Sequence, residues 1–207
     1  MRSRILRNEI TLSEYQKEVL IGLVLGDGCL VVQNNPAFAR LQVCQSLKQE
    51  EFVLWLYKVF TNFVRTPPKI KERFRNGKHY REMWFNTLTY LSIKEFYDIF
   101  YQNRKKIVPE DINHLLTPTA FAVWFMGDGS VKSKECRGRI LNTQGFNKQD
   151  IQRLIIVLKE KFNLIPSIRT QKDGLQIYIS AKSAEVLNAI LKDKILPYFY
   201  YKLPLKS

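Results

Sequence analysis

Two stretches decide the fold: LIGLVLGDG at Leu20–Gly28 and FAVWFMGDG at Phe121–Gly129. Each is an apolar run that ends in an acidic residue set between two glycines, and Asp27 and Asp128 lie 101 residues apart. This spacing indicates a module that occurs twice. A hydrophobic helix in each copy delivers its carboxylate at the helix end, where unpaired carbonyls already make the local potential negative. Two such ends brought together predict a divalent-cation site.

The residues within and before the motifs predict how the two helices start and pack. The first motif has three glycines in nine residues, and a helical glycine costs about 1 kcal/mol relative to alanine. We therefore expect Gly22 to permit close backbone approach between the two helices. Thr11 with Glu14 has the form of a capping box before the first helix, and Thr117 with Pro118 matches a cap followed by proline at the first helical position.

The same elements are predicted after each motif. Two strands are expected at residues 29–33 and 40–45, and again at 131–134 and 139–144. Apolar spacing predicts helices over 52–63 and 151–162, and further helices are expected over 92–102 and 183–194. Asn76-Gly77 and Asp173-Gly174 predict a hairpin in each copy. The sequence thus predicts a mixed α/β (α+β) fold of two pseudo-symmetric αββαββα modules, residues 9–112 and 113–207.

The composition favours a nucleic-acid partner. The chain has 207 residues, which is enough for one compact unit or two half-sized ones, and 45% of them are hydrophobic. Its formal net charge is +14, with an excess of 6 in residues 1–116 and of 8 in residues 117–207. Both halves are therefore expected to face a polyanion, which fits phosphate binding better than a membrane surface. The alternative is that the lysines serve solubility alone.

Cysteines and apolar runs narrow the class of protein further. Cys29, Cys44 and Cys136 are too few and too scattered for a disulfide framework or a zinc site. We expect them to be buried thiols in a reducing compartment. No apolar run approaches the roughly 18 residues that a membrane span requires, and residues 1–8 lack the apolar region of a signal peptide.

The hairpins carry the most informative surface. With Asn76-Gly77 as the turn, one face of the first hairpin is cationic, and Ile70 and Phe74 belong to the opposite face that covers a core. A two-stranded ribbon fits the major groove, where such side chains reach base edges. An ordinary solvated sheet face is the alternative. The residues expected to contact nucleic acid are Lys69, Lys71, Arg73, Arg75, Lys78, Tyr80, Gln33, Arg40, Gln42, Lys132, Lys134, Arg137, Arg139, Arg169, Gln171, Gln176 and Tyr178.

The doubled motif resembles that of the LAGLIDADG homing endonucleases, in the single-chain form with two motifs. The first copy matches the family's nine letters at Leu20, Gly22, Leu23, Asp27 and Gly28, and the second matches at Ala122, Asp128 and Gly129. Phe121, Trp124 and Phe125 are bulkier than the family's usual residues. The resemblance covers residues 12–204, and it implies a monomer in which two antiparallel sheets form a DNA-binding saddle.

The resemblance also implies catalytic roles. Lys106 and Lys202 each lie just beyond the last helix of their copy and before a proline, and in the family such lysines reach the cleft near the metals. There a cation stabilises the phosphate or helps to activate water. Lys105 is an equally reachable neighbour. Gln45 and Gln144 occupy equivalent places, where the family has a polar residue that orders water, although a plain strand glutamine is the alternative.

Metal-assisted hydrolysis follows from the residue types. Mg²⁺ prefers hard oxygen ligands and keeps several waters, so one carboxylate per module with main-chain carbonyls and DNA phosphates is a sufficient set. The expected ligands are Asp27, Asp128, Gly26 and Gly127, which would hold two or three ions, with Mn²⁺ able to substitute. A Gly-Asp-Gly turn alone would be weak evidence, but here it occurs twice in matching modules.

The expected function is a site-specific homing endonuclease that makes double-strand cuts in a long DNA target and promotes mobility of an intron or intein. An RNA maturase that binds its host intron is the alternative from a different class, and a catalytically silent DNA-binding regulator is a third. Retention of both acids favours cleavage, because a pure RNA or DNA binder does not need them.

Overall fold

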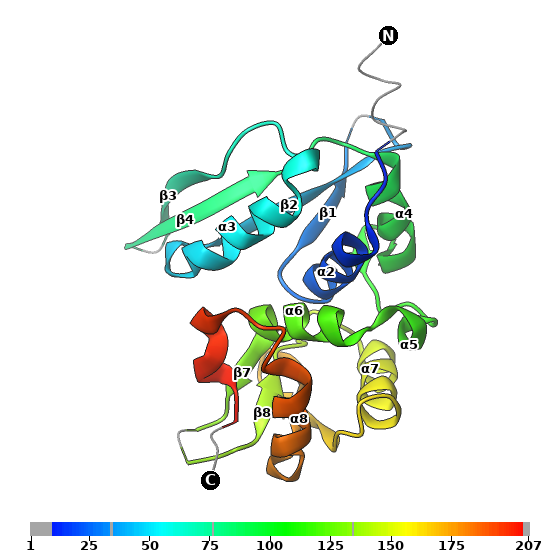
Figure 1. Ribbon diagram of the computed structural model, residues 1–207, viewed down its shortest axis with the longest axis vertical. Coiled ribbons are helices and arrows are strands. Elements are labelled where there is room, and N and C mark those ends of the chain that lie inside the picture. The colour runs from blue at the N-terminus through cyan, green and yellow to red at the C-terminus, as the bar shows by residue number, and fades with distance from the viewer. Residues whose placement is uncertain (1–9, 34, 76, 134, 205–207) are drawn as a thin grey trace. The chain divides into compact units, whose positions relative to one another are not determined.

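The computed structural model describes residues 10–33, 35–75, 77–133 and 135–204 (Figure 1). Among these residues, eight strands form two four-stranded antiparallel sheets: β1 (Cys29–Val32), β2 (Ala39–Ser46), β3 (Lys69–Arg75) and β4 (Lys78–Asn86) in one, and β7 (Gly129–Val131), β8 (Arg139–Leu141), β9 (Pro166–Gln171) and β10 (Gly174–Ile179) in the other. The strand orders are β1-β2-β4-β3 and β7-β8-β10-β9. The same topology occurs twice, which confirms the predicted α+β fold.

The helices of the described chain alternate with these strands. They are α2 (Glu14–Leu25), α3 (Glu50–Val59), α4 (Leu91–Phe100), α5 (Ile112–Leu115), α6 (Pro118–Asp128), α7 (Lys148–Glu160) and α8 (Ala184–Leu191). Short 3₁₀ segments are η1 (Leu47–Gln49), η2 (Thr61–Phe63), η3 (Ala181–Ser183) and η4 (Pro197–Lys202). A two-stranded hairpin, β5 (Tyr101–Gln102) with β6 (Lys105–Lys106), follows α4. The sequence did not predict this hairpin.

The chain divides into two compact units. One contains the described residues up to 17 together with 27–99, and the other contains residues 18–26 together with those from 100 onward. Most of the first motif helix therefore belongs to the same unit as the second motif helix. The expected modules, 9–112 and 113–207, are units of sequence repetition, and their boundary stays a prediction.

The cap of helix α2 is Ser13, two residues after the predicted cap, Thr11. Ser13 Oγ accepts a hydrogen bond from the Gln16 amide at 3.2 Å, and Gln16 Oε1 accepts one from the Ser13 amide at 3.0 Å. This reciprocal pair is a capping box, so the assignment of that role to Thr11 and Glu14 is wrong. Ser13 is the residue immediately before the helix, and a cap acts only from that position.

Helix α6 begins as predicted. Thr117 Oγ1 accepts a hydrogen bond from the Ala120 amide at 3.2 Å, and Pro118 occupies the first helical turn. Residues from Ala120 to Met126 are all buried, as are those from Val19 to Leu25 in α2. A helix that is apolar on every side requires burial on every side. Both motif helices are therefore central elements of the fold.

Gly22 lies where the two motif helices touch. A β-carbon on Gly22 would lie 2.3 Å from the main-chain oxygen of Ala120 and 2.7 Å from the β-carbon of Val123. Both distances are far shorter than a van der Waals contact, and the first involves backbone that cannot swing aside. The expected close backbone approach is thus confirmed, and it explains why a helix former does not occupy this position.

The first sheet packs its inner face on α3. Met83 and Phe85 of β4 are buried, and Phe52 and Leu56 of α3 are fully buried. Figure 1 shows α3 running alongside β4. The core is therefore a layer of aromatic and aliphatic side chains between helix and sheet.

The outer part of the first hairpin has no such cover. Ile70 is 49% exposed and Phe74 is 78% exposed, so their predicted place in the core is wrong. The Phe74 ring stacks on His79, with centroids 4.6 Å apart. Alternation along the strand correctly gives the face of these side chains, but the helix covers only the part of that face that carries Met83 and Phe85.

The second hairpin turns one residue earlier than predicted. Gly174 pairs with Gln171, so the turn residues are Lys172 and Asp173 rather than Asp173 and Gly174. Gly174 has φ of +138°, which only glycine adopts readily, and it serves as the first residue of β10. The pairing shifts by two residues, so every side chain keeps the face that was predicted for it.

The cysteines are less buried than expected. Cys29 and Cys44 are exposed and Cys136 is half-buried, and no disulfide joins any of the three. Among the described residues, no helix has the length and apolar character to cross a membrane.

We predict that Gly22→Ala destabilises the protein, whereas Gly145→Ala does not. The added methyl at position 22 overlaps the Ala120 carbonyl, and overpacking costs roughly 1–3 kcal/mol. Nothing lies within 4 Å of a β-carbon placed on Gly145, which makes it the matched control. Chemical unfolding of both variants beside the unmodified protein measures the difference. Equal free energies of unfolding for the two variants would contradict the packing role of Gly22.

Candidate active site and nucleic-acid interface

The first motif ends in an exposed carboxylate. Helix α2 stops at Leu25, and the Gly26 amide still bonds back to the carbonyls of Gly22 and Leu23, at 3.2 and 3.1 Å. Asp27 follows, outside the helix and exposed. The Gln45 amide nitrogen donates to Asp27 Oδ2 at 3.1 Å. The structure therefore brings Gln45 of β2 to the first motif acid.

The second motif acid has a different environment. Asp128 is the last residue of α6 and is half-buried, and the Trp124 indole one turn earlier donates to its Oδ2 at 3.2 Å. The Asp128 carbonyl accepts from the Asn142 amide nitrogens of main chain and side chain, at 3.0 and 2.8 Å. A β-carbon on Gly26 would lie 3.6 Å from Asp128 Oδ2. Trp124, which is bulkier than the family's usual residue, thus orients the carboxylate.

Gln144 does not repeat the contact of Gln45. Its side chain donates to Asp173 Oδ2 at 3.2 Å, in the turn of the second hairpin. Strand β8 ends at Leu141, three residues before Gln144, so the chain has left the sheet before it reaches this position. The identical letters in the two copies therefore do not mark equivalent places. Asn142, which the sequence analysis missed, lies at the end of the second motif instead.

Lys106 reaches the end of the first motif. Its ammonium donates to the main-chain oxygen of Gly26 at 2.7 Å. The β5–β6 hairpin turns through Asn103 and Arg104, both with positive φ, of 50° and 64°. Neighbouring residues of a strand point to opposite faces, so Lys105 is directed away and is exposed. The hairpin thus brings Lys106, and not Lys105, to the end of the first motif.

Lys202 reaches the end of the second motif in the same way. It is the last residue of η4, and its ammonium donates to the main-chain oxygens of Met126 and Gly127, at 2.6 and 3.2 Å. The same ammonium lies 4.9 Å from the centre of the Phe199 ring. Only 6% of the residue is exposed. A buried cation is costly unless it is compensated, and carbonyls at a helix C-terminus supply that compensation.

The donor chemistry of each motif end fits a hard divalent cation. Each presents one carboxylate and main-chain oxygens, which are the ligand types that Mg²⁺ and Mn²⁺ prefer. The carbonyls of Gly26 and Gly127 already bind an ammonium, which shows that these oxygens are oriented to hold positive charge. In the part of the chain that the structure describes, no group of three or more acidic, histidine or cysteine side chains forms a conventional protein-only metal site.

The cationic face of the first hairpin has the predicted register. Arg73 pairs with Tyr80, and Lys71 pairs with Glu82. Glu82 Oε2 lies 3.3 Å from both the Lys71 ammonium and the Arg73 Nε atom. Lys69, Lys78 and Tyr80 are exposed, and the side chain of Arg75 lies outside the described residues, as do Asn76 and Lys134.

Glu82 connects the charges on this face. Burial opposes ionisation of its carboxyl, but the Cys44 thiol, Lys71 and Arg73 outweigh it, so the pKa of Glu82 lies below its usual value. Burial is the main cause that raises the pKa of the Cys44 thiol, and Glu82 adds to it. The thiol donates to Glu82 Oε2 at 3.5 Å. One acidic residue therefore holds two cations of this face in place.

The second sheet is less open than predicted. Gln176 is buried and donates to Asn142 Oδ1 at 2.8 Å, so its side chain serves the second motif end rather than the surface. Arg139 is only 2% exposed, and burial lowers its pKa. Arg169, Gln171 and Tyr178 are half-buried. Placing Gln176 and Arg139 among surface contacts is therefore wrong, because strand alternation does not reveal what packs against a given face.

The remaining predicted contacts vary in exposure. Gln33 and Lys132 are exposed, and the Lys132 ammonium lies 5.0 Å from the centre of the Tyr178 ring. Arg40 and Gln42 are half-buried, and Arg137 forms an ion pair with Glu185.

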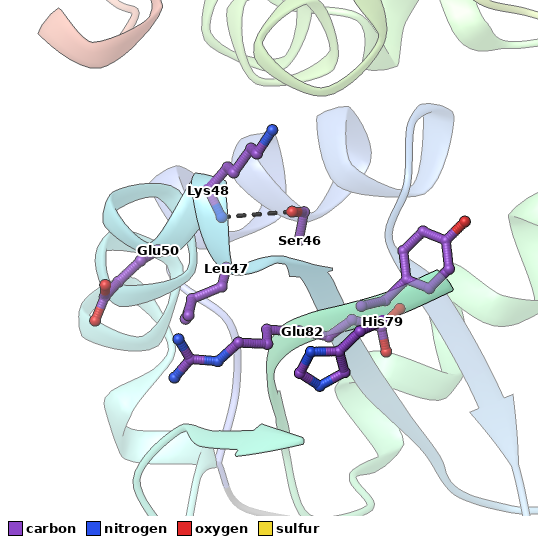
Figure 2. A pocket seen from close by; sticks show the side chains of 8 residues that line it. Ser46, Leu47, Lys48, Glu50, His79 and Glu82 are labelled. Atoms are coloured by element: carbon purple, nitrogen blue, oxygen red, sulfur yellow. Dashed lines mark hydrogen bonds between the residues drawn. The ribbon is translucent and has the colours of Figure 1, made fainter. Parts of the chain in front are cut away.

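A separate hollow of about 880 Å³ lies on the first unit, away from its motif acid (Figure 2). Its lining combines the end of β2 and η1 with β4, and includes Lys48, Glu50, His79 and Glu82. Ser46 Oγ accepts a hydrogen bond from the Lys48 amide at 3.4 Å, as Figure 2 shows. Cations and carboxylates are mixed there, and neither Asp27 nor Gln45 lines it. The hollow is therefore not the place where the motif residues act.

Comparison with known proteins decides the family. The LAGLIDADG DNA endonuclease family matches residues 17–187. The chain belongs to this family. It is 32% identical over 199 residues to the probable intron-encoded endonuclease 1 of Wickerhamomyces canadensis, covering 93% of this chain and 85% of that protein. It is 29% identical over 208 residues to the cytochrome b mRNA maturase bI2 of Debaryomyces hansenii, covering 98% and 78%.

Solved structures agree with this family assignment. The homing endonuclease I-WcaI bound to its DNA recognition sequence superimposes with a TM-score of 0.90 and 30% identity, covering 96% of this chain and 89% of that one. A structure of I-DmoI in complex with DNA and Mn gives a TM-score of 0.55 at 15% identity, covering 87% and 97%, which is a likeness of fold. The chain is thus a LAGLIDADG homing DNA endonuclease, and some of its relatives are named as intron-encoded.

Proposed function

We propose that this LAGLIDADG protein cuts both strands of a long double-stranded DNA target in a Mg²⁺-dependent hydrolysis, and that it acts as a monomer. Asp27 with the Gly26 carbonyl, and Asp128 with the Gly127 carbonyl, would hold the divalent ions together with DNA phosphates and water. Divalent ions bound there would lower the pKa of a bound water and neutralise charge on the phosphate. The crystal structure of I-DmoI in complex with DNA and Mn supports divalent metals for this fold.

One observation carries this proposal. In both halves a lysine from beyond the last helix places its ammonium on main-chain oxygens next to a motif acid. A fixed positive charge at that place is suited to stabilising the charge that develops on a phosphate during hydrolysis. Gln45, which donates to Asp27, would hold this carboxylate in orientation. The differing partners of the two acids support distinct roles for them in cutting the two strands.

We predict that Asp27→Asn and Asp128→Asn abolish double-strand cleavage while DNA binding is retained. Removal of a charged metal ligand should raise the barrier by several kcal/mol, and each 1.4 kcal/mol or so is about tenfold in rate. Cleavage of plasmid DNA that carries the joined exon sequence, with a gel-shift assay as the binding control, measures both effects. Single variants that leave a nicked product would indicate that each acid serves mainly one strand. Undiminished double-strand cutting by either variant would refute its role.

We predict that Lys106→Met slows cleavage by tenfold or more, a loss of roughly 1.4 kcal/mol of transition-state stabilisation, whereas Lys105→Met cuts like the unmodified protein. The two variants remove the same charge from neighbouring positions, but only Lys106 contacts the Gly26 carbonyl. Single-turnover rates at saturating protein compare the two directly. Equal losses for both variants would assign the effect to net charge rather than to the placed ammonium.

We propose that the cationic face of the β3–β4 hairpin reads the DNA major groove. Support comes from its exposed Arg73, Lys69 and Lys78, and from Glu82, which holds Lys71 and Arg73 side by side. A guanidinium suits a guanine edge, and lysines suit phosphates.

On this basis we predict that Arg73→Ala costs roughly 1–3 kcal/mol and relaxes preference at one base pair. In contrast, Lys69→Ala should weaken binding to all sequences alike and lower the salt slope by about one unit. A cleavage-specificity profile and salt titrations of the two variants distinguish these outcomes. An unaltered base preference in Arg73→Ala would show that this arginine does not read sequence.

Maturase activity is the second candidate function. The observation that favours it is the 29% identity to an mRNA maturase across 98% of the chain. Splicing of a host intron by the Asp27→Asn variant tests it, because RNA binding does not require the metal ligand. If the Asp27→Asn variant supports splicing of the intron as well as the unmodified protein does, and splicing fails without either, the protein has maturase activity.

A further inference from the structure

We propose that Arg139 and Asp150, two buried charged residues, position the lysines at the motif ends by anchoring the main chain that carries them. Each contacts the backbone within two residues of one lysine. Arg139 holds the segment of Lys202, and Asp150 holds the segment of Lys106. The inference rests on the proposed function, because it matters only if these lysines act in cleavage.

Arg139 binds the main chain of the segment that carries Lys202. Its Nε donates to the main-chain oxygen of Lys202 at 2.5 Å, and its Nη2 donates to that of Leu203. Its Nη1 donates to the oxygens of Cys136 and Gly138, at 3.0 and 2.9 Å. Among the described residues no carboxylate lies within ion-pair distance of this guanidinium. The guanidinium therefore donates to main-chain carbonyls, two of which belong to Lys202 and Leu203.

Asp150 is bonded to the segment of the other lysine. It is 1% exposed, and its Oδ1 accepts from the amide of Val108, two residues beyond Lys106, at 3.1 Å. Arg153 donates to the same Oδ1 at 3.1 Å and to the Val108 carbonyl at 3.3 Å. Both polar groups of Val108 are thus bound from helix α7. A buried carboxylate is costly, and here it holds a segment that follows a strand of two residues.

The two lysine segments need such anchors because they are weak elements. Lys106 lies in a two-residue strand, and Lys202 lies in a 3₁₀ helix of six residues. Isolated hairpins and 3₁₀ turns are marginal by themselves. Leu30 pairs with Leu41 in the first half as Val131 pairs with Arg139 in the second, so Leu41, which is fully buried, is the counterpart of Arg139. The strand position is therefore buried in both halves, and in the second half it carries a guanidinium that binds the segment of Lys202.

The test measures cleavage of each DNA strand separately, with the two strands labelled differently. Displacement of a catalytic group by about 1 Å can cost up to about 100-fold in rate. We expect Arg139→Met to slow cleavage by tenfold or more on one DNA strand, the same strand whose cleavage Lys202→Met slows. Asp150→Leu should slow cleavage of the strand whose cleavage Lys106→Met slows. Asp150→Asn keeps an acceptor for the Val108 amide, so it should cut that strand at much of the normal rate.

The ratio of the two strand rates separates positioning from folding. A smaller folded fraction lowers both rates equally, because unfolded protein cuts neither strand. Lys192→Met, which removes an exposed charge in the same half, is the control and should leave the ratio unchanged. If Arg139→Met does not fold, Arg139→Lys and Asn188→Ala take its place, since Asn188 donates to the Pro204 carbonyl at 3.0 Å in the same segment.

The outcomes are distinct. Equal slowing of both strands by the Arg139 and Asn188 variants, or by Asp150→Leu, would overturn the positioning roles. Normal rates in Lys106→Met and Lys202→Met would instead overturn the catalytic assignment of the lysines, and the proposal with it. Strand bias in the anchor variants that matches the bias of the lysine variants would support both.

Discussion

The close contact of the two motif helices at Gly22 is the constraint on which the rest of the structure depends. The Ala120 carbonyl occupies the place where any β-carbon at position 22 would lie, so the helices approach more closely than side chains normally allow. This contact places most of the first motif helix in the same compact unit as the second. It also accounts for the apolar character of both motifs, because residues on every side of each helix are buried.

Partial negative charge is concentrated at the C-terminal ends of these helices. Two lysines bind there, one from a two-residue strand and one from a 3₁₀ helix. Carbonyls at the end of a helix attract cations, and Lys106 and Lys202 satisfy this need on the two motifs. The halves are nevertheless unequal. Asp27 is exposed and bonded by Gln45, whereas Asp128 is half-buried and bonded by Trp124. A duplicated topology therefore carries two different carboxylate environments, which is the physical basis for expecting the strands to be cut at different rates.

Much of this could be predicted from sequence where a local pattern dictates a local structure. The Thr117 cap and the register of the β3–β4 hairpin depend on nearby residues, and both predictions are confirmed. The prediction of the second turn is wrong because Gly174 begins strand β10 and does not belong to the turn. The roles of Arg139 and Gln176 could not be predicted, because burial depends on segments far along the chain, such as residues 202 and 142. The sequence leaves Lys105 and Lys106 equally reachable, and only the β5–β6 hairpin, with its non-glycine turn, brings Lys106 to the Gly26 carbonyl.

The central claim is that each motif end binds divalent metal through one aspartate and the preceding glycine carbonyl. Its most direct test is a crystal structure with Mn²⁺ and the DNA formed by joining the sequences that flank the reading frame, with anomalous scattering to locate the ions. The account predicts Mn²⁺ peaks at the Asp27 and Asp128 carboxylates and at the Gly26 and Gly127 oxygens. Cleaved DNA with peaks at other residues, or with either aspartate uncoordinated, would contradict it.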